Sequence, residues 1–470
     1  MLDSAAAKCL APDCDLALKN HNSNAENADF SQDKAWHTLP NFSFMFNKLR
    51  HFIRRFITGG DWANRLPLES RRNLYRYWFD GLFAAASDTV PINYLTLYLL
   101  AVGATGAQVG WFSALSSLAA ALALLPGAFI VEKYGRRKDF TVIFGGLLAR
   151  MMLMLMALAP LPLSGQPLVW LVITLGVIRS AAGNLAYPAW MSLTGDIVPM
   201  EGRGRYFGSR NFVMVVAGIV VTYLMGEFIT RVGSPQGYQL ALGLSFLTGM
   251  VSTYFFWRIQ DSAGEQPVQS EMKLSLTEVW QDFRSSPLFL QFCIAMAVWN
   301  LSLNIAGPFF NVYMAQDLGF TAAMIGLSAI AANITRVLTQ RKMGELADRW
   351  GPGRMQMVSM FLVPILPILW MFASQLWHVL VINSLAGVFW GAFELASFNF
   401  LLVFMPENRR ARYSAIFQVV VTISLALGAA LGSALIDSAW GYGWVFILSA
   451  IGRFTAAFLF LLLMRKVPGV

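Results

Sequence analysis

The chain has 470 residues, of which 56% are hydrophobic and only 13% are charged. Proteins that fold in water carry about 25% charged residues, so this composition excludes a soluble globular protein and favours one whose main solvent is lipid. The formal net charge of +9 is compatible with nucleic acid or anionic lipid as a partner, and the positions of the cations along the chain decide between these alternatives.

The first part of the chain is polar and then becomes basic. Residues 1–45 are rich in Asn, Asp, Ser and Ala, which predicts a cytoplasmic tail without regular structure. Residues 48–76 interleave arginines with apolar side chains. This basic segment is typical of a helix that lies on anionic headgroups, with membrane lipids as its partner, but also of ordinary positive charge beside a first span. Both alternatives stay open for this N-terminal region, residues 1–76.

Apolar segments long enough to cross a bilayer recur from residue 77 to residue 464. A spanning helix needs roughly 20 apolar residues, and twelve segments meet this requirement. The predicted spans are residues 77–100, 108–131, 139–160, 167–191, 207–230, 238–257, 288–312, 322–341, 355–373, 377–402, 413–436 and 442–464. We therefore predict an all-α integral membrane protein with 12 transmembrane helices in two six-helix bundles, over residues 77–257 and 288–470. The polar interval 258–287 is interpreted as a cytoplasmic linker with one amphipathic helix.

With these spans, nearly all loop lysines and arginines fall on one side of the membrane, and the other side has essentially Arg231 alone. Cytoplasmic loops of membrane proteins are enriched in Lys and Arg, so both the N and C termini are predicted to be cytoplasmic. We infer a multi-pass protein of the plasma or inner membrane. The basic charge is thereby explained without a nucleic-acid partner.

Two pairs of loops carry matching sequences in the two halves. Residues 132–137, after the second span, read Glu-Lys-Tyr-Gly-Arg-Arg, and residues 348–351, after the eighth span, read Asp-Arg-Trp-Gly. After the fourth and tenth spans, a Pro-x-x-x-Arg-x-Arg-Tyr pattern begins at Pro199 and at Pro406. Matching loops at equivalent places indicate an internal duplication.

These loops resemble those of the major facilitator superfamily (MFS), in which Gly-x-x-x-Asp-Arg-x-Gly-Arg-Arg follows the second helix and recurs after the eighth. The second copy in this chain, from Gly344 to Gly351, has the same spacing. The first copy has Glu132 in place of Asp, and Gly127 lies one residue too far upstream. The resemblance covers about 390 residues. It implies the MFS transporter fold but specifies no substrate.

In the resembling family, the charges of these loops latch the outward-facing state, which implies a gating role here. The candidate gating residues are Glu132, Gly135, Arg136, Arg137, Gly344, Asp348, Arg349 and Gly351. Carboxylates beside arginines and a helix N-terminus form a charge cluster that can hold one conformation and separate in another, and the glycines indicate tight turns. The alternative is that these charges only set the topology in the membrane.

Ionisable and amide side chains lie within predicted spans one, four, seven and ten, where polar groups are costly and are functional candidates by default. They are Asp88, Arg179, Asn300, Asn304 and Glu394. In the resembling family these four helices line the central cavity. The same spans carry aromatic side chains that either line a cavity or pack between helices, namely Tyr94, Tyr98, Tyr187, Trp190, Trp299 and Trp390.

Asp88 is the first candidate for a proton carrier, because a carboxylate in a medium of low dielectric constant binds a proton more readily than in water. Arg179 is predicted to face it, either as a counter-charge that works in transport or as a static ion pair. Asp80, near the start of its span, is expected to reach water. Arg150 and Arg453 lie within spans expected to be peripheral, and the sequence assigns them no role.

The sequence contains no Gly-x-x-x-x-Gly-Lys-Ser/Thr loop, so we expect gradient-driven or facilitated transport. It shows no pairing of nucleophile with base and no metal-ligand spacing, which predicts a protein that is not an enzyme and uses no metal or cofactor. We predict a monomeric permease for a small organic solute, with protons as candidate coupling ions. The alternatives are a multidrug or amphiphile exporter and a non-transporting sensor.

Overall fold

The computed structural model describes part of the chain, namely His51, residues 53–260, Arg284, and residues 286–403, 410–436 and 441–465. The predicted tail over residues 1–45 and most of the predicted linker, residues 261–283, lie outside the described residues. Every regular element within the described part is helical, in agreement with the predicted all-α class.

The helices of the first half are η1 (Asp61–Arg65), α2 (Leu68–Ala101), α3 (Gly106–Tyr134), α4 (Arg137–Phe140), η2 (Thr141–Leu148), α5 (Ala149–Leu158), α6 (Gly165–Ile197), η3 (Met200–Gly202), α7 (Arg203–Val232) and α8 (Gln236–Trp257). Those of the second half are α10 (Pro287–Ala306), α11 (Phe309–Gln316), α12 (Ala322–Trp350), α13 (Pro352–Leu362), α14 (Ile365–Trp370), α15 (Leu376–Val403), α16 (Arg410–Ile436) and α17 (Gly441–Met464).

Eleven segments of the described chain are long and apolar enough to cross a membrane. The first predicted span, which lies within α2, is not among them, although α2 has 34 residues. Its polar side chains, including Asp80, Asp88 and Asn93, lower its mean hydropathy. The helix also begins at Leu68, inside the segment predicted to be juxtamembrane. The helices are consistent with twelve spans, of which α2 is the first.

Three predicted spans are irregular, and two of the interruptions occur at prolines. The seventh span consists of α10 and α11, which are separated at Gly307 and Pro308, and the ninth consists of α13 and α14, with Pro364 between them. A proline inside a helix removes one hydrogen bond and clashes with the preceding turn. The third span contains the π-helical segment η2 between α4 and α5.

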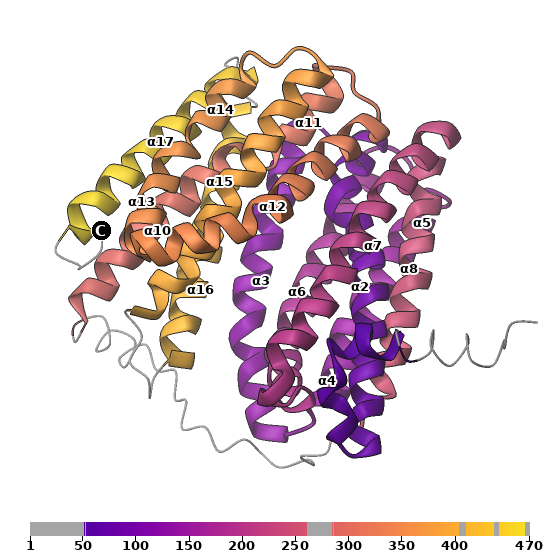
Figure 1. The fold of residues 1–470 in the computed structure, drawn as a ribbon. Helices are drawn as coiled ribbons and strands as arrows, with labels where there is room; N and C mark the ends of the chain where they lie inside the picture. The colour runs from indigo at the N-terminus through magenta and orange to yellow at the C-terminus, as the bar shows by residue number, and fades with distance from the viewer. Residues whose placement is uncertain are drawn as a thin grey trace, which may run out of the picture. The chain divides into compact units, whose positions relative to one another are not determined.

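The packing of the helices repeats between the halves. In the first half α3 packs on α6, and α2 packs on α8 and α7; in the second half α12 packs on α15, and α10 packs on α17 and α16. Within each half, the second span therefore packs on the fourth, and the first span packs on the sixth and the fifth. The two halves contact each other through α3 with α16 and through α7 with α12 (Figure 1), which are again equivalent pairs. The duplication predicted from the loops is therefore also present in the packing.

Glycines allow two of these helix pairs to approach closely. A Cβ atom on Gly127 of α3 would collide with the backbone oxygen of Leu185 on α6, and one on Gly387 of α15 would collide with that of Ala332 on α12. Small residues at crossings let transmembrane helices pack backbone to backbone. These two crossings are equivalent in the repeat, so the second and fourth spans of each half form a tight pair.

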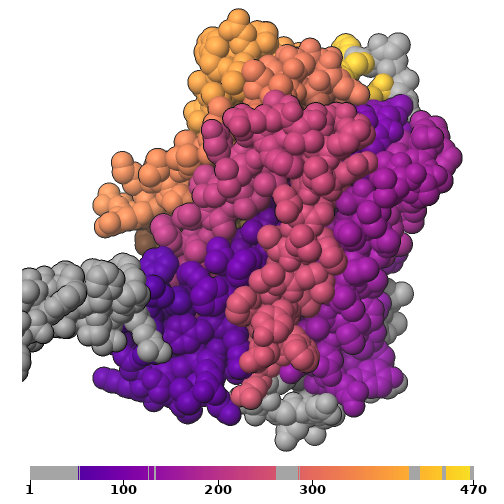
Figure 2. Space-filling view, turned by 90° about the vertical axis from the view of Figure 1, so that its right-hand side faces the viewer, coloured from indigo at the N-terminus to yellow at the C-terminus, as the bar shows by residue number. Residues whose placement is uncertain are grey.

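One exposed lateral surface of the first half is formed partly by α8. Figure 2 shows α8 running between the indigo start of α2 and the purple segment that contains α5, in agreement with the packing of α8 on both helices. Large apolar side chains of α8, such as Leu240, Leu247 and Trp257, are more than half exposed. Such a face suits contact with lipid tails rather than water.

The halves meet near helix ends that share one side of the predicted membrane. Ser433, near the end of α16, donates a hydrogen bond of 2.5 Å to the backbone oxygen of Ala107 at the start of α3. The backbone N–H of Ala323, at the start of α12, donates to the hydroxyl of Thr230 near the end of α7 at 3.1 Å. The charge pattern of the loops predicts that this is the outer side. These two hydrogen bonds therefore join the halves at the predicted outer end of their interface.

Candidate functional site

Asp88 lies at the centre of an ion cluster formed by three spans of the first half. Its Oδ1 accepts a hydrogen bond of 2.7 Å from Nη2 of Arg179 on α6, so the predicted contact between these two residues is present. Arg150 at the start of α5 binds the same carboxylate with both terminal nitrogens, Nη1 to Oδ1 and Nη2 to Oδ2 at 3.1 Å. The carboxylate thus has two arginine partners, and the cluster has a net charge of +1.

The surroundings of Arg150 explain why a charge is tolerated in a predicted peripheral span. Its Nη1 also donates to the hydroxyl of Ser87 at 3.0 Å, and Ser87 in turn donates to the backbone oxygen of Ser245 on α8. A Cβ atom at Gly249 of α8 would lie 2.5 Å from Cδ of Arg150, so only glycine leaves room for the side chain. The π-helical segment η2 ends directly before α5, which carries Arg150.

Asp80 does not reach water as expected. It is buried, its Oδ1 accepts a hydrogen bond of 2.7 Å from Ser252, and its Oδ2 lies 3.3 Å from Nη2 of Arg210 on α7. The guanidinium of Arg210 also stacks over the ring of Tyr77, 4.2 Å from its centroid. The sequence prediction for Asp80 is therefore wrong, because Arg210, which lies inside the predicted fifth span and was given no role, turns inward to pair with it.

The predicted pathway residues of the second half have different environments. Glu394 on α15 forms an ion pair of 3.2 Å with Arg336 on α12. Asn300 is buried, and its amide donates to the backbone oxygen of Met296 one turn earlier in α10. Asn304 lines a cavity and donates to the backbone oxygen of Leu425 on α16. The structure therefore places one of these residues, Asn304, at a cavity wall.

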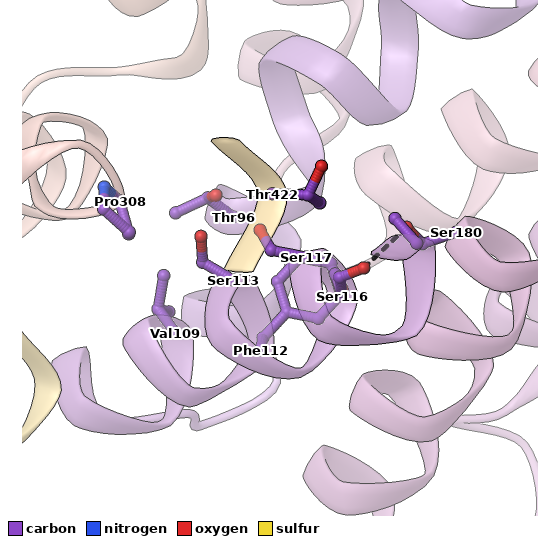
Figure 3. A pocket seen from close by; sticks show the side chains of 10 residues that line it. Thr96, Val109, Phe112, Ser113, Ser116, Ser117, Ser180, Pro308 and Thr422 are labelled. Carbon is purple, nitrogen blue, oxygen red and sulfur yellow. Dashed lines mark hydrogen bonds between the residues drawn. The ribbon is translucent and has the colours of Figure 1, made fainter. Parts of the chain in front are cut away.

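A pocket of about 290 Å³ has walls from both halves, and most of the residues that line it carry a hydroxyl group (Figure 3). The lining hydroxyl residues are Thr96, Ser113, Ser116, Ser117, Ser180 and Thr422. Ser180 donates to the backbone oxygen of Ser116 at 3.0 Å, whereas the buried hydroxyl of Ser116 has no partner among the described residues. The sequence analysis missed these small polar residues, because serine and threonine are common in spans without any function.

A second cavity, of about 340 Å³, is lined by four asparagines, by aromatic rings and by Arg453. The asparagines are Asn93 of α2 and Asn304, Asn311 and Asn383 of the second half, and the indole rings are those of Trp370 and Trp390. Trp390 thus lines a cavity, which is one of the two alternatives predicted for these aromatic side chains. Tyr94, Tyr98 and Trp299 are instead fully buried in the hydrophobic core.

The two loops predicted to act in gating share a turn. Gly135 follows α3 with a φ of 66° and Gly351 follows α12 with a φ of 84°, and each donates its N–H to the carbonyl four residues earlier. Positive φ angles favour glycine, so the predicted tight turns are present. Gly344 lies within α12, not in a turn.

The charges of the two loops differ in their contacts. Arg137 is buried and donates from Nη1 to Asp196 at the end of α6 at 2.6 Å. Asp348 and Arg349 are exposed at the end of α12. Arg136 begins the short turn that leads into α4, and the side chain of Glu132 lies outside the described part of the chain. Asp196 was not predicted, since a lone carboxylate at a span end carries no distinctive signal.

A protein family with the same arrangement of two packed halves matches the sequence of this chain. The model of the Major Facilitator Superfamily matches residues 78–306 and 300–470, which contain both halves and both of the repeated loops. The chain belongs to this superfamily. It is a multi-pass membrane transporter, as the resemblance of the loops predicted.

Two relatives named as multidrug proteins align with most of the chain. The chain is 23% identical over 394 residues to "Multidrug resistance protein MdtG" of Serratia proteamaculans, covering 81% of this chain and 91% of the relative. It is 25% identical over 389 residues to "Multi-drug resistance efflux pump PmrA" of Streptococcus pneumoniae, covering 81% and 92%.

Solved structures share the fold at lower identity. The nucleoside transporter NupG aligns with a TM-score of 0.65 at 13% identity, over 83% of this chain and 99% of its own. The xylose transporter XylE from E. coli aligns with a TM-score of 0.60 at 14% identity, over 86% and 98%. At this identity the likeness shows the fold alone.

Proposed function

We propose that this transporter carries a small polar organic solute by alternating access, without a catalytic step, through a site between its two halves. The observation that supports this proposal most is the hydroxyl-lined pocket, because Thr96, Ser113 and Ser180 come from the first half and Pro308 and Thr422 from the second. A pocket with walls from both halves changes when the halves rock, so a solute bound there is exposed to one side of the membrane at a time.

We further propose that the Asp88 cluster couples transport to protons. Arg179 and the pocket residue Ser180 are neighbours in α6, so a shift of this helix affects both the cluster and the pocket. In the structure, Asp88 binds two guanidinium groups, and a proton on it would leave both without a counter-charge. Proton uptake by Asp88 then requires a second conformation in which at least one arginine has withdrawn.

Export of amphiphilic drugs is the second candidate function. The curated relatives named above are described as multidrug proteins, and two tryptophans offer apolar contact in the larger cavity. Lipophilic cations, however, need an acidic or aromatic environment without competing positive charge. Arg453 in the same cavity and the net positive Asp88 cluster disfavour such cations.

The test compares four probes on the purified full-length protein: D-xylose, uridine, mandelate and ethidium. A ligand present at about 100 times its Kd stabilises the folded state by about 2.7 kcal/mol, which raises the midpoint of thermal unfolding. Any probe that stabilises is then offered to the protein in liposomes with an imposed proton gradient. Saturable uptake of a polar probe is the expected result. Stabilisation and transport of ethidium alone would replace the proposal with the exporter.

A pair of matched variants locates the site. Thr96→Val keeps the shape of a pocket side chain but removes its hydroxyl, so we expect weaker binding of D-xylose or uridine, whichever of the two stabilises the protein. Thr455→Val is the control, since Thr455 is an exposed residue of α17 whose hydroxyl bonds its own helix. Equal binding in both variants would place the solute outside this pocket.

A further inference from the structure

Arg453 is a buried charge whose counter-charge is missing from the described chain. It lies near the middle of α17 and is 3% exposed. Its Nη2 donates to the backbone oxygen of Leu303 at 3.3 Å. No described carboxylate pairs with it, and its Nε has no partner among the residues that the structure describes. Arg150, which is also buried at mid-span, and the half-buried Arg179 both bind Asp88. An unpaired arginine at this depth is unfavourable unless something else neutralises it.

The cavity of about 340 Å³ beside Arg453 is where a counter-charge fits. Of its described lining residues, Arg453 alone is charged, and the others are amides, a serine, a glycine, rings and aliphatic groups. A single positive charge without an acidic neighbour favours a ligand with one negative charge. It disfavours zwitterions, whose ammonium group would find no carboxylate in this lining.

The amides of the cavity indicate which other groups the ligand carries. The amide nitrogens of Asn93, Asn304 and Asn383 donate to Thr222, to the backbone of Leu425 and to that of Val379 respectively. Their carbonyl oxygens accept no hydrogen bond from the described residues and are free to accept one from a ligand. A ligand with hydroxyl groups satisfies such acceptors.

The remaining wall is aromatic. The rings of Phe310, Trp370 and Trp390 border the same cavity, and Phe310 and Trp370 pack against each other with centroids 5.1 Å apart. Rings of this kind bind the apolar part of an organic molecule. The cavity volume is at the small end of the range for ligand sites, which suits a molecule of modest size.

We propose that this cavity is a binding site for a small hydroxycarboxylate, with the carboxylate on Arg453, hydroxyl groups on the asparagine carbonyls and an apolar part against the tryptophans. This cavity shares no lining residue with the hydroxyl-lined pocket, so the proposal goes beyond the proposed function and adds a second binding site to the transporter. A bound carboxylate would receive charge-assisted hydrogen bonds from the guanidinium and supply its missing counter-charge.

The first test uses the wild-type protein and two ligands that differ only in charge. Mandelate and its neutral amide, mandelamide, have the same ring and hydroxyl group. We expect mandelate to raise the midpoint of thermal unfolding saturably at constant chloride, and mandelamide to bind at least tenfold more weakly. Equal stabilisation by both ligands, or a shift produced by chloride alone, would overturn the proposal.

Variants of Arg453 form the second test. Arg453→Gln should weaken mandelate binding at least tenfold and leave mandelamide unchanged, and Arg453→Lys should fall between. Because Arg453→Gln removes an uncompensated buried charge, it should not prevent folding. Arg465→Gln is the control, since Arg465 is exposed just after α17 and the substitution removes the same charge. Unaltered mandelate affinity in Arg453→Gln would reject the site.

The failure of this site and of the proposed function are distinguishable. If mandelate binds through Arg453 but no probe enters liposomes, the site stands and the transport proposal falls. If D-xylose or uridine is taken up saturably while mandelate does not bind, the transport proposal stands and the hydroxycarboxylate site is rejected.

Discussion

The ionisable residues within the spans have three different environments. Asp88 binds two arginines, Asp80 binds one arginine and a serine in the core, and Arg453 has no acidic partner among the described residues. Residue type and depth along a span do not separate these cases. What separates them is whether the neighbouring helix carries a complementary charge, which decides if the group stabilises the fold or is left to bind something else.

Asp88→Asn should abolish accumulation of a transported probe against its gradient while sparing exchange, because an amide cannot bind and release a proton. Accumulation and counterflow in liposomes would be measured side by side. Glu227→Gln is a matched control, since Glu227 forms an exposed pair with Arg231 one turn later and loses the same charge. Accumulation at the wild-type level in Asp88→Asn would remove this residue from coupling.

Arg210→Met should destabilise the protein by about 3–5 kcal/mol, because it leaves Asp80 buried without its cation. The double variant Arg210→Met with Asp80→Asn should recover most of this loss, since no buried charge remains. Unfolding in denaturant measures the free energy of each protein. A double variant as unstable as Arg210→Met alone would show that packing of Arg210 on Tyr77, rather than its charge, holds this site.

At the scale of helices, the sequence predicted positions better than orientations. The span boundaries, the duplication and the turns at Gly135 and Gly351 follow from hydropathy and glycine spacing, and the contact of Asp88 with Arg179 follows from complementary charges at similar depth. Arg150 could not be paired in advance, because its direction depends on the π-helical segment before it and on the space at Gly249. Such features come from tertiary packing and leave no periodic signal.

Asp348→Ala should slow transport without weakening the fold. In the structure Asp348 is exposed at the end of α12 and has no ion pair among the described residues. Its replacement by alanine should therefore hardly change the stability of the observed conformation. A latch formed in the opposite state would lose an exposed ion pair of up to about 1 kcal/mol, which is roughly a two- to fivefold change in rate.

The control for this latch variant is Glu345→Ala, one turn earlier, where an exposed acid pairs with Arg341 on the same helix. Turnover in liposomes and the midpoint of thermal unfolding would be measured for both. If the two variants turn over equally fast, Asp348 acts only as a surface charge.

At the scale of the whole transporter, the duplicated packing suggests a simple basis for alternating access. Equivalent spans form the contacts between the halves, α3 with α16 and α7 with α12, and the hydrogen bonds from Ser433 and Ala323 fasten the predicted outer end. Opening that end requires these bonds to break while each half keeps its own packing. If the two rigid halves exchange contacts at one end of their interface for contacts at the other, the shared pocket is exposed to each side of the membrane in turn.

A cross-link across the outer end tests this movement directly. Cysteines in place of Ala107 and Ser433, in a background without the natural cysteines, are oxidised, and the extent of disulfide formation is measured first; the hydrogen bond from Ser433 to the backbone of Ala107 shows that the two segments are in contact. Uptake of the probe identified in the binding test should fall to background and return after reduction, since the bond holds the halves in one state.

Each single cysteine variant should be insensitive to the oxidant. Unchanged uptake by fully cross-linked protein would mean that the contact between α3 and α16 stays closed during transport, and the halves would then have to move about this contact as a fixed hinge.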